Sequence, residues 1–316
     1  MTLAMVALTG CNPPGVPGIG QSGPPKELTA QDAAKNLKGT IYVVSGGRVF
    51  RLRGGGVSAL TGTDRKVAYP AVTADGQKTA VALIGAGHSE IAVGGPDFNN
   101  LSSLTTAPKD PHNASIDLKP AFSPDGTRVA FMSDRGRCCS DQQIWEGPFA
   151  PYKPRQVSTP PDLTGGDDAP VYLSGTSLLF VGWRSVNGDA RNVRAGLMQA
   201  GVPSGKPKVA YAPGDSDILD PSPGPAGKLA FVRRKGDSAD VEVGGIDGAG
   251  ATKITSFGDT RQPVWAPDGS AIIFISRHSG SLDLWSVAAD GKGDPQRLTW
   301  GADLDDNSRP AWIGAS

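Results

Sequence analysis

Residues 120–135 read Pro-Ala-Phe-Ser-Pro-Asp-Gly-Thr-Arg-Val-Ala-Phe-Met-Ser-Asp-Arg, and the first half of this stretch recurs along the chain. Pro70 and Pro263 begin close copies of it. Shorter copies begin at Pro170, Pro221 and Pro310. The six starts are 42 to 51 residues apart. A regular interval of this size indicates a protein built from repeated structural units.

Each unit contains signals for four short strands. In the unit that begins at Pro120, Pro120–Ser123 can begin a strand, and Asp125-Gly126 predicts a tight turn, because glycine accepts the positive φ that hairpin turns need. Arg128–Met132 is apolar and rich in residues that favour strands. Further strands are expected at 143–146 and 154–158. Four antiparallel strands per unit, with few helix signals, are typical of a propeller blade.

The two ends of the chain complement each other. The last copy, 310–313, supplies a single strand, whereas the residues before Pro70 supply three strands, at 40–44, 48–53 and 56–60. One C-terminal strand and three N-terminal strands complete a blade, and closing the ring in this way leaves no open sheet edge. We therefore predict an all-β fold, a six-bladed β-propeller of four-stranded antiparallel blades over residues 40–316, with 310–313 joining 40–60.

The repeat resembles that of TolB-type six-bladed propellers. The motifs that carry the resemblance lie at 122–126, 129–135, 284–285 and 297–299. The resemblance extends from about residue 40 to residue 316 and is uninformative about function, because such repeats occur in many unrelated propellers. TolB itself has a separate α/β domain before the propeller. The segment before Thr40 is too short for a folded domain, so we expect a form without it.

Composition excludes some classes of function. The chain has 316 residues, with 31 Lys and Arg and 31 Asp and Glu, so no overall basic field attracts nucleic acid. The 43 Gly and 27 Pro are explained by the many turns of a propeller. No run of 18 apolar residues is present, and we expect contact with a membrane only through a lipid anchor.

That anchor is expected at Cys11. Leu3–Leu8 is apolar, and Leu8-Thr9-Gly10-Cys11 resembles a bacterial lipobox, which implies cleavage before Cys11 and lipidation of its thiol. Residues 1–10 would then be the remnant of a signal peptide whose true start lies upstream of Met1, since the apolar run is short and lacks a basic start. Residues 11–39 would be a lipidated tether. This predicts an extracytoplasmic location in a bacterial cell envelope; the alternative is a disordered tail with an incidental cysteine.

Cysteine and histidine offer two further candidate sites. Cys138 and Cys139 are adjacent, so they form a vicinal disulfide, remain two free thiols, or take part in redox or metal chemistry. His88 and His278 follow expected second strands, and His112 precedes Pro120, which places all three on one face of a propeller. These histidines suggest a metal centre; exposed loop histidines without a ligand role are the alternative, and we expect no metal and no cofactor.

Acidic loops precede most of the repeat prolines, and arginines follow the second strands. Alternating strand directions bring both kinds of residue to one face, which we call the Asp/Arg face. One interpretation is that Asp and Arg pair between neighbouring blades and hold the ring together; another is an anionic rim that binds a cation or a basic peptide. The candidate binding residues are Asp303, Asp305, Asp306, Asp167, Asp168, Asp217, Arg135 and Arg277.

The sequence favours binding over catalysis. It contains no Gly-x-Ser-x-Gly elbow, no His-Glu-x-x-His and no phosphate loop, so we name no catalytic residue. We expect a monomeric, non-catalytic propeller that binds an envelope protein or peptide at the Asp/Arg face or the channel mouth. The alternative is a polysaccharide lyase or hydrolase with a metal at the channel mouth.

Overall fold

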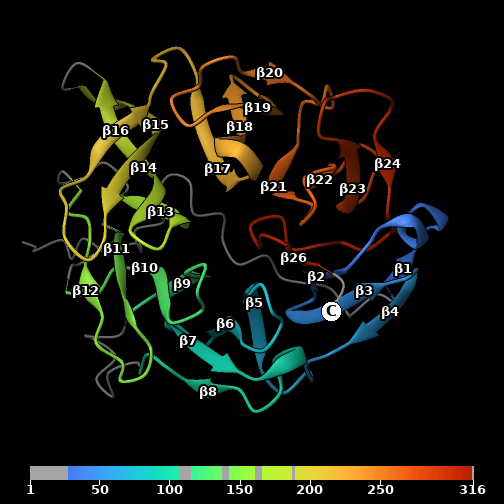
Figure 1. Cartoon of the computed structure of the whole chain (residues 1–316), viewed down its shortest axis with the longest axis horizontal. Coiled ribbons are helices and arrows are strands. Elements are labelled where there is room, and N and C mark those ends of the chain that lie inside the picture. Colours follow the sequence, from blue (N-terminus) through green and yellow to red (C-terminus); the bar gives the residue numbers. More distant parts are fainter. Residues whose placement is uncertain (1–27, 107–114, 137–141, 161–165, 187–188, 315–316) are drawn as a thin grey trace, which may run out of the picture.

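The computed structural model describes residues 28–106, 115–136, 142–160, 166–186 and 189–314. Six four-stranded antiparallel sheets surround a central axis, as Figure 1 shows. The predicted six-bladed β-propeller is therefore confirmed. Within the described residues, no helix is long and apolar enough to cross a bilayer.

The blades follow one another in chain order, and in each blade the strands run from the central axis outward in the order stated. Blade 1 contains β26 (Ala311–Ile313), β2 (Thr40–Ser45), β3 (Arg48–Arg53) and β4 (Gly56–Ala59). Blade 2 contains β5 (Lys66–Val72), β6 (Thr79–Ile84), β7 (Ser89–Gly94) and β8 (Ser102–Ser103). Blade 3 contains β9 (Asp117–Phe122), β10 (Arg128–Ser133), β11 (Gln143–Pro148) and β12 (Arg155–Gln156).

The second half of the ring repeats this order. Blade 4 contains β13 (Asp167–Ser174), β14 (Ser177–Val186), β15 (Asp189–Gly201) and β16 (Lys208–Tyr211). Blade 5 contains β17 (Asp217–Pro223), β18 (Lys228–Lys235), β19 (Ser238–Gly245) and β20 (Thr252–Lys253). Blade 6 contains β21 (Arg261–Trp265), β22 (Ala271–Ser276), β23 (Asp283–Ala288) and β24 (Gln296–Arg297).

The core lies between neighbouring blades, and the second strand of each blade supplies its centre. A phenylalanine that is 0% exposed stands at the fourth position of the second strand in four consecutive blades: Phe131, Phe180, Phe231 and Phe274. Because second strands are covered on both faces by adjacent blades, they are almost continuously apolar, as in Ala271–Ser276. This repeated packing gives blades 3 to 6 a similar core.

The ring closes where the sequence predicted. The C-terminal strand β26 pairs with β2 in the register Thr40 with Ile313, Ile41 with Trp312 and Tyr42 with Ala311. Trp312 is 9% exposed, and its Nε1 donates a hydrogen bond of 2.9 Å to the carbonyl oxygen of Lys38. The closing strand therefore joins blade 1 through both backbone pairing and a buried side chain.

The Asp-Gly turns of the repeat have a structural role. In the turn after β9, Gly126 has a φ of +63°, and Asp125 accepts hydrogen bonds from the Thr127 amide and the Ser123 hydroxyl. These bonds hold the turn between the first and second strands, at the opposite end of the blade from the Asp/Arg face. The most conspicuous residues of the repeat therefore shape the hairpin.

Residues 28–37 fold against the ring, although they lie within the segment 11–39 that was expected to be a tether. Two residues of this segment, β1 (Thr29–Ala30), pair with β25 (Thr299–Trp300). A 3₁₀ helix, η1 (Asp32–Asn36), follows. Leu28 and Ala34 are buried in the core shared by blades 1 and 6. The folded unit thus includes residues N-terminal to Thr40.

Candidate functional site

Aspartates at the start of the inner strands are paired with arginines at or just after the end of the second strands. Asp117 lies 3.0 Å from Arg135 (Oδ2 to Nη2), and Asp217 lies 2.8 Å from Arg234. Both members of each pair belong to the same blade, which differs from the expected pairing between neighbouring blades. The reason is the antiparallel register, since the first residue of the inner strand faces the end of the second strand, as Asp217 faces Arg234.

Asp167 and Arg184 form the same kind of pair in blade 4, at 2.7 Å. Asp167 is 0% exposed; burial raises the pKa of its carboxyl, although the Arg184 guanidinium opposes this shift. Asp259 instead accepts a 2.7 Å hydrogen bond from the backbone amide of Arg277, whose side chain is exposed. Arg135 and Arg277, both candidate binding residues, are thus placed differently: Arg135 is held in an ion pair, and Arg277 is held through its backbone.

The loop 303–307 connects blade 6 to the closing strand. Asp306 forms an ion pair with Arg261 of β21, and the backbone amide of Asp305 donates to the Val44 carbonyl of blade 1 at 2.9 Å. Burial raises the pKa of the Asp305 carboxyl, and the Asn307 amide partly opposes this by donating to it. Asp303 is exposed with a φ of +43°. The Asp303 carbonyl accepts a hydrogen bond from the Ser45 hydroxyl of blade 1 at 3.4 Å, so all three acids of this loop help to join the ring.

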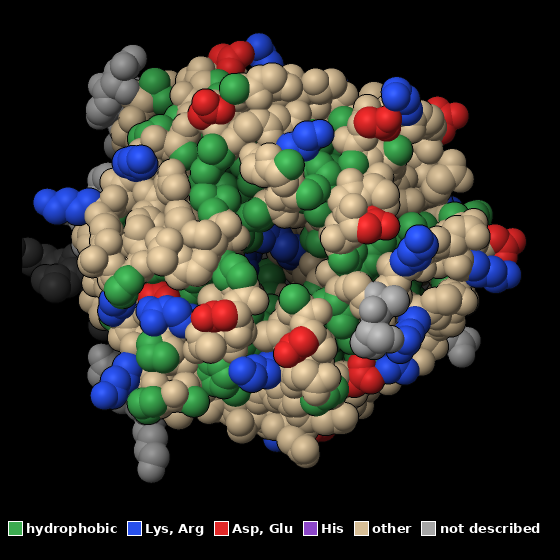
Figure 2. Space-filling view, viewed as in Figure 1, with side chains coloured by type: hydrophobic (Ala, Val, Ile, Leu, Met, Phe, Trp, Pro, Cys, Tyr) green, Lys and Arg blue, Asp and Glu red, His purple; other side chains and the backbone are tan. Residues whose placement is uncertain are grey.

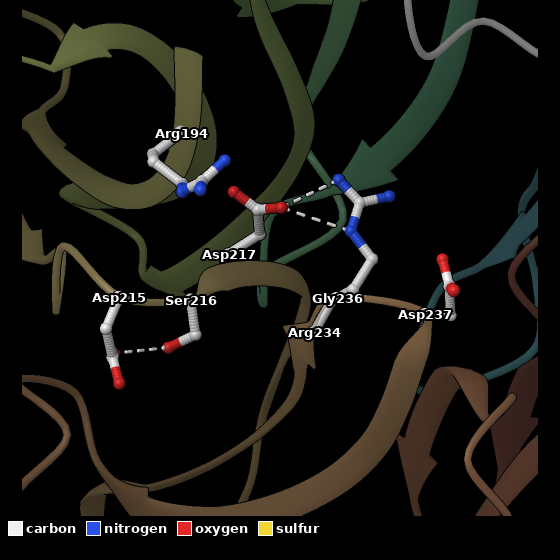
Figure 3. Close-up of a pocket in the computed structure, with 7 residues that line it drawn as sticks. All are labelled: Arg194, Asp215, Ser216, Asp217, Arg234, Gly236 and Asp237. Atoms are coloured by element: carbon white, nitrogen blue, oxygen red, sulfur yellow. Dashed lines mark hydrogen bonds and ion pairs between the residues drawn. The ribbon is translucent and has the colours of Figure 1, made fainter. Parts of the chain in front are cut away.

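A groove of about 440 Å³ opens on the Asp/Arg face between blades 4 and 5. Figure 3 shows Asp217 between Arg194 and Arg234, with hydrogen bonds drawn to Arg234. The neighbouring Asp215 pairs with Lys235 at 2.9 Å. The residues that line the groove are Arg194, Asp215, Ser216, Asp217, Arg234, Gly236 and Asp237. Apart from Gly236, the residues that line the groove are polar or charged, and they carry both signs of charge.

The central channel forms a second cavity, of about 210 Å³. Figure 2 shows a hollow at the centre of the ring with basic side chains inside it. Lys119 and Arg309 are the basic residues that line the cavity. Lys119 pairs at 2.7 Å with Asp168 of the next inner strand. Asp168, a predicted binding residue, therefore helps to hold blades 3 and 4 together.

A backbone irregularity turns several side chains toward this channel. In five inner strands the residue immediately before the repeat proline has a φ between +50° and +56°: Tyr69, Lys119, Ala169, Asp220 and Gln262. The pairing with the second strand shifts register at the same place, which indicates a β-bulge. Four of these five residues line the channel. Sequence reasoning missed this set, although its position before each proline is a signal that could have identified it.

The described histidines lie in the expected loops. His88 follows β6 and contacts the Ala86 carbonyl through Nδ1 at 3.2 Å, and His278 follows β22 and stacks on Phe257, with ring centroids 3.9 Å apart. Over the part of the chain that the structure describes, no three His, Cys, Asp or Glu side chains are grouped as metal ligands would be. His112 and the cysteines Cys11, Cys138 and Cys139 lie outside the described residues.

Comparison of the structure with solved structures identifies similar folds. TolB from Acinetobacter baumannii superposes with a TM-score of 0.68 at 17% identity, over 87% of this chain and 66% of that one. This chain has a TolB-like six-bladed propeller fold. A TolB from Agrobacterium tumefaciens gives a TM-score of 0.59 at 15% identity, over 84% of this chain and 92% of that one.

The same propeller also occurs in enzymes. An oligogalacturonate lyase solved with manganese gives a TM-score of 0.52 at 16% identity, over 87% of this chain and 73% of that one. No protein-family profile matches the sequence, and no curated protein matches it either. These similarities show the fold, and the function has to be argued from the site.

Proposed function

We propose that this protein is a non-catalytic binding propeller of the cell envelope, and that it holds an extended peptide or a protein segment on the Asp/Arg face. The groove between blades 4 and 5 carries this proposal. Arg194 and Asp237 line its two sides, and both are exposed. In the described part of the chain neither forms an ion pair with another side chain. A segment that presents an acidic and a basic side chain would complement them both.

The charges around Arg194 and Asp237 are already held in place. Arg234 donates from Nε and Nη2 to Asp217, at 3.1 and 2.8 Å, and Asp217 also accepts the backbone amide of Ala195 from the neighbouring blade at 3.0 Å. These bonds make the groove floor rigid. A preformed surface loses little conformational freedom when a partner binds, which favours affinity.

We further propose that lipidation at Cys11 holds the protein in the envelope, with residues 1–10 removed and a tether joining Cys11 to the propeller. The lipobox-like Leu8-Thr9-Gly10-Cys11 supports this. Labelling bacterial cells with a radioactive or alkyne-tagged fatty acid should mark the wild-type protein and leave Cys11→Ser unmarked. Labelling of both proteins, or of neither, would contradict lipidation at this residue.

The binding proposal is tested with synthetic peptides. We would screen fluorescent peptides that contain both Lys and Glu by anisotropy, and expect Arg194→Ala and Asp237→Asn each to weaken the best peptide about tenfold. Asp290→Asn is the matched control, because Asp290 pairs with Lys292 in a turn between third and fourth strands, on the opposite face. Equal affinity in the two groove variants and the wild type would refute the groove as the binding site.

A further inference from the structure

The central channel has a polar level and an apolar level. The polar level is formed by the residues immediately before the repeat prolines, which include Lys119 and Gln262. The half-buried Val72, Phe122 and Ile313 line the same cavity at the ends of their inner strands, beside the Asp-Gly turns. Figure 2 shows apolar side chains around the central hollow and basic side chains deeper inside it. The cavity is therefore amphipathic, with an apolar mouth.

Gln262 has a side chain whose hydrogen-bonding capacity is unused. The residue is 5% exposed, and its backbone N–H donates to Asp220 at 3.1 Å. Within the described part of the chain its carboxamide forms no hydrogen bond. In contrast to Nε and Nη2 of Arg309, which are sealed from water, the carboxamide remains open to the cavity. A nearly buried amide without a partner is unfavourable, so a ligand that bonds to it is favoured.

Lys119 supplies hydrogen-bond donors from the opposite wall. It stands at the same position of blade 3 as Gln262 does of blade 6, and these two blades lie opposite each other in the ring (Figure 1). The Lys119 side chain is 19% exposed, and among the described residues its Nζ donates one hydrogen bond, to Asp168 at 2.7 Å. An ammonium group has three donors, so two are left for a ligand in the channel.

The charges around the polar level disfavour a charged ligand. Lys119 and Arg309 repel an ammonium group. Burial lowers the pKa of Arg309, and the nearby carboxylates of Asp220 and Asp168 oppose that shift; these two carboxylates repel an anion. Asp305, which is close enough to Lys119 to interact with it, adds a further negative charge. An ion of either sign would also lose hydration on passing the apolar mouth, so an uncharged polar group is favoured.

The size of the cavity limits the ligand to a small molecule. Its volume of about 210 Å³ corresponds to roughly seven molecules of liquid water, and thus to roughly seven non-hydrogen atoms. A primary carboxamide on a chain of about four further carbons has this size. Such a molecule has one end that matches the polar level and another that matches the apolar level.

We propose that the central channel binds a small uncharged molecule that carries a primary carboxamide on a short alkyl chain. The amide oxygen of the ligand accepts a hydrogen bond from Nζ of Lys119, and its N–H donates to Oε1 of Gln262. The alkyl chain lies against Val72, Phe122 and Ile313. The ligand enters from the face of the Asp-Gly turns, so this site is independent of the groove on the Asp/Arg face.

Calorimetric titration of the intact protein with pentanamide, pentanoate and pentylammonium tests this site, because these probes share a chain length and differ in charge. We expect pentanamide to bind at least about tenfold more tightly than either ion. Propanamide should bind about fifteenfold more weakly than pentanamide, since each buried methylene contributes about a factor of four. Equal or tighter binding of either ion, or no binding of pentanamide at about 10 mM, would overturn the proposal.

Two channel variants test the polar contacts. Gln262→Leu keeps a similar volume and should weaken pentanamide about tenfold, because the carboxamide contact is lost. Lys119→Met leaves Asp168 without its cation, so pentylammonium should then bind more tightly than pentanamide. Asp290→Asn, in an exposed pair on an outer turn, is the control and should match the wild type. Unchanged pentanamide binding in either channel variant would contradict the assigned contacts, and the order of the three probes on the wild type decides the proposal if a variant fails to fold.

Discussion

Replacement of Trp312 by alanine tests how strongly the closing strand holds the ring. Trp312 is 9% exposed and packs in the core shared by blades 1 and 6. A buried Trp removes about 150–250 Å² from water, which at about 25 cal/mol per Å² corresponds to about 4–6 kcal/mol. Measured Trp→Ala changes in cores cost about 3–5 kcal/mol. The lost hydrogen bond to Lys38 adds about 1 kcal/mol, so we expect a total near 5 kcal/mol.

The chain provides a matched control in Trp300, which is 60% exposed. The guanidinium carbon of Arg297 lies 4.0 Å from the centre of its ring, and an exposed cation–π contact contributes about 0.5–1 kcal/mol. Trp300→Ala should therefore cost about 1 kcal/mol. Trp312→Phe retains most of the apolar area and loses the N–H donor, so an intermediate cost of about 2 kcal/mol is expected.

Thermal unfolding followed by far-ultraviolet circular dichroism measures the difference. For a chain of this size each kcal/mol shifts the midpoint by about 2 °C, so Trp312→Ala should lower it by about 10 °C and Trp300→Ala by about 2 °C. A broader transition in Trp312→Ala would indicate that blade 1 separates from the ring before the other blades. Midpoints for the two alanine variants within about 2 °C of each other would refute the view that β26 couples the ends of the ring.

Three further changes test charged groups. Burial alone would raise the pKa of Asp283, but hydrogen bonds from neighbouring side chains and one backbone amide lower it. The Asp283 carboxylate should therefore stabilise the fold above about pH 4, and this stabilisation should be lost as the pH falls further. In acid titrations of unfolding, Asp283→Asn should flatten the dependence of stability on pH. Burial raises the pKa of Asp305, so its ionised carboxylate lowers the stability of the folded protein at pH 7. Asp305→Asn should therefore raise the thermal midpoint at pH 7. Glu146 is 0% exposed and paired with Arg128, so Glu146→Gln should cost about 3 kcal/mol in urea unfolding. Asp290 lies in an exposed pair with Lys292, so Asp290→Asn should leave the urea midpoint almost unchanged.

Ring closure was predictable because its signals are local. The repeat proline, the Asp-Gly turn and the apolar second strand lie within about 16 residues of one another, and each acts on its own stretch of backbone. Counting strands was enough to predict that the single strand at Pro310 and the three strands before Pro70 together form one four-stranded blade. The observed β3 (Arg48–Arg53) has the predicted bounds, and most of the other strands differ from prediction by one to three residues at their ends.

The folded N-terminal segment and the ion pairs were harder to predict. Residues 28–37 contain few signals of regular structure, and their position depends on the exposed edge of β25, which exists only once blade 6 has formed. The pairing of Asp117 with Arg135 inside one blade depends on the register between β9 and β10. The sequence shows that both residue types reach the same face, but it does not show which partner is within bonding distance.

The amino-acid sequence by itself determined the number of blades, the order of their strands and the closure of the ring, since these follow from periodicity and from turns that are encoded locally. Tertiary structure alone decided what faces the axis. The bulge before each proline turns residues such as Lys119 toward the channel, and burial of Arg309 without a described partner for Nε and Nη2 results from packing six inner strands around one axis. A residue's neighbours across that axis come from different blades, and no local pattern specifies them.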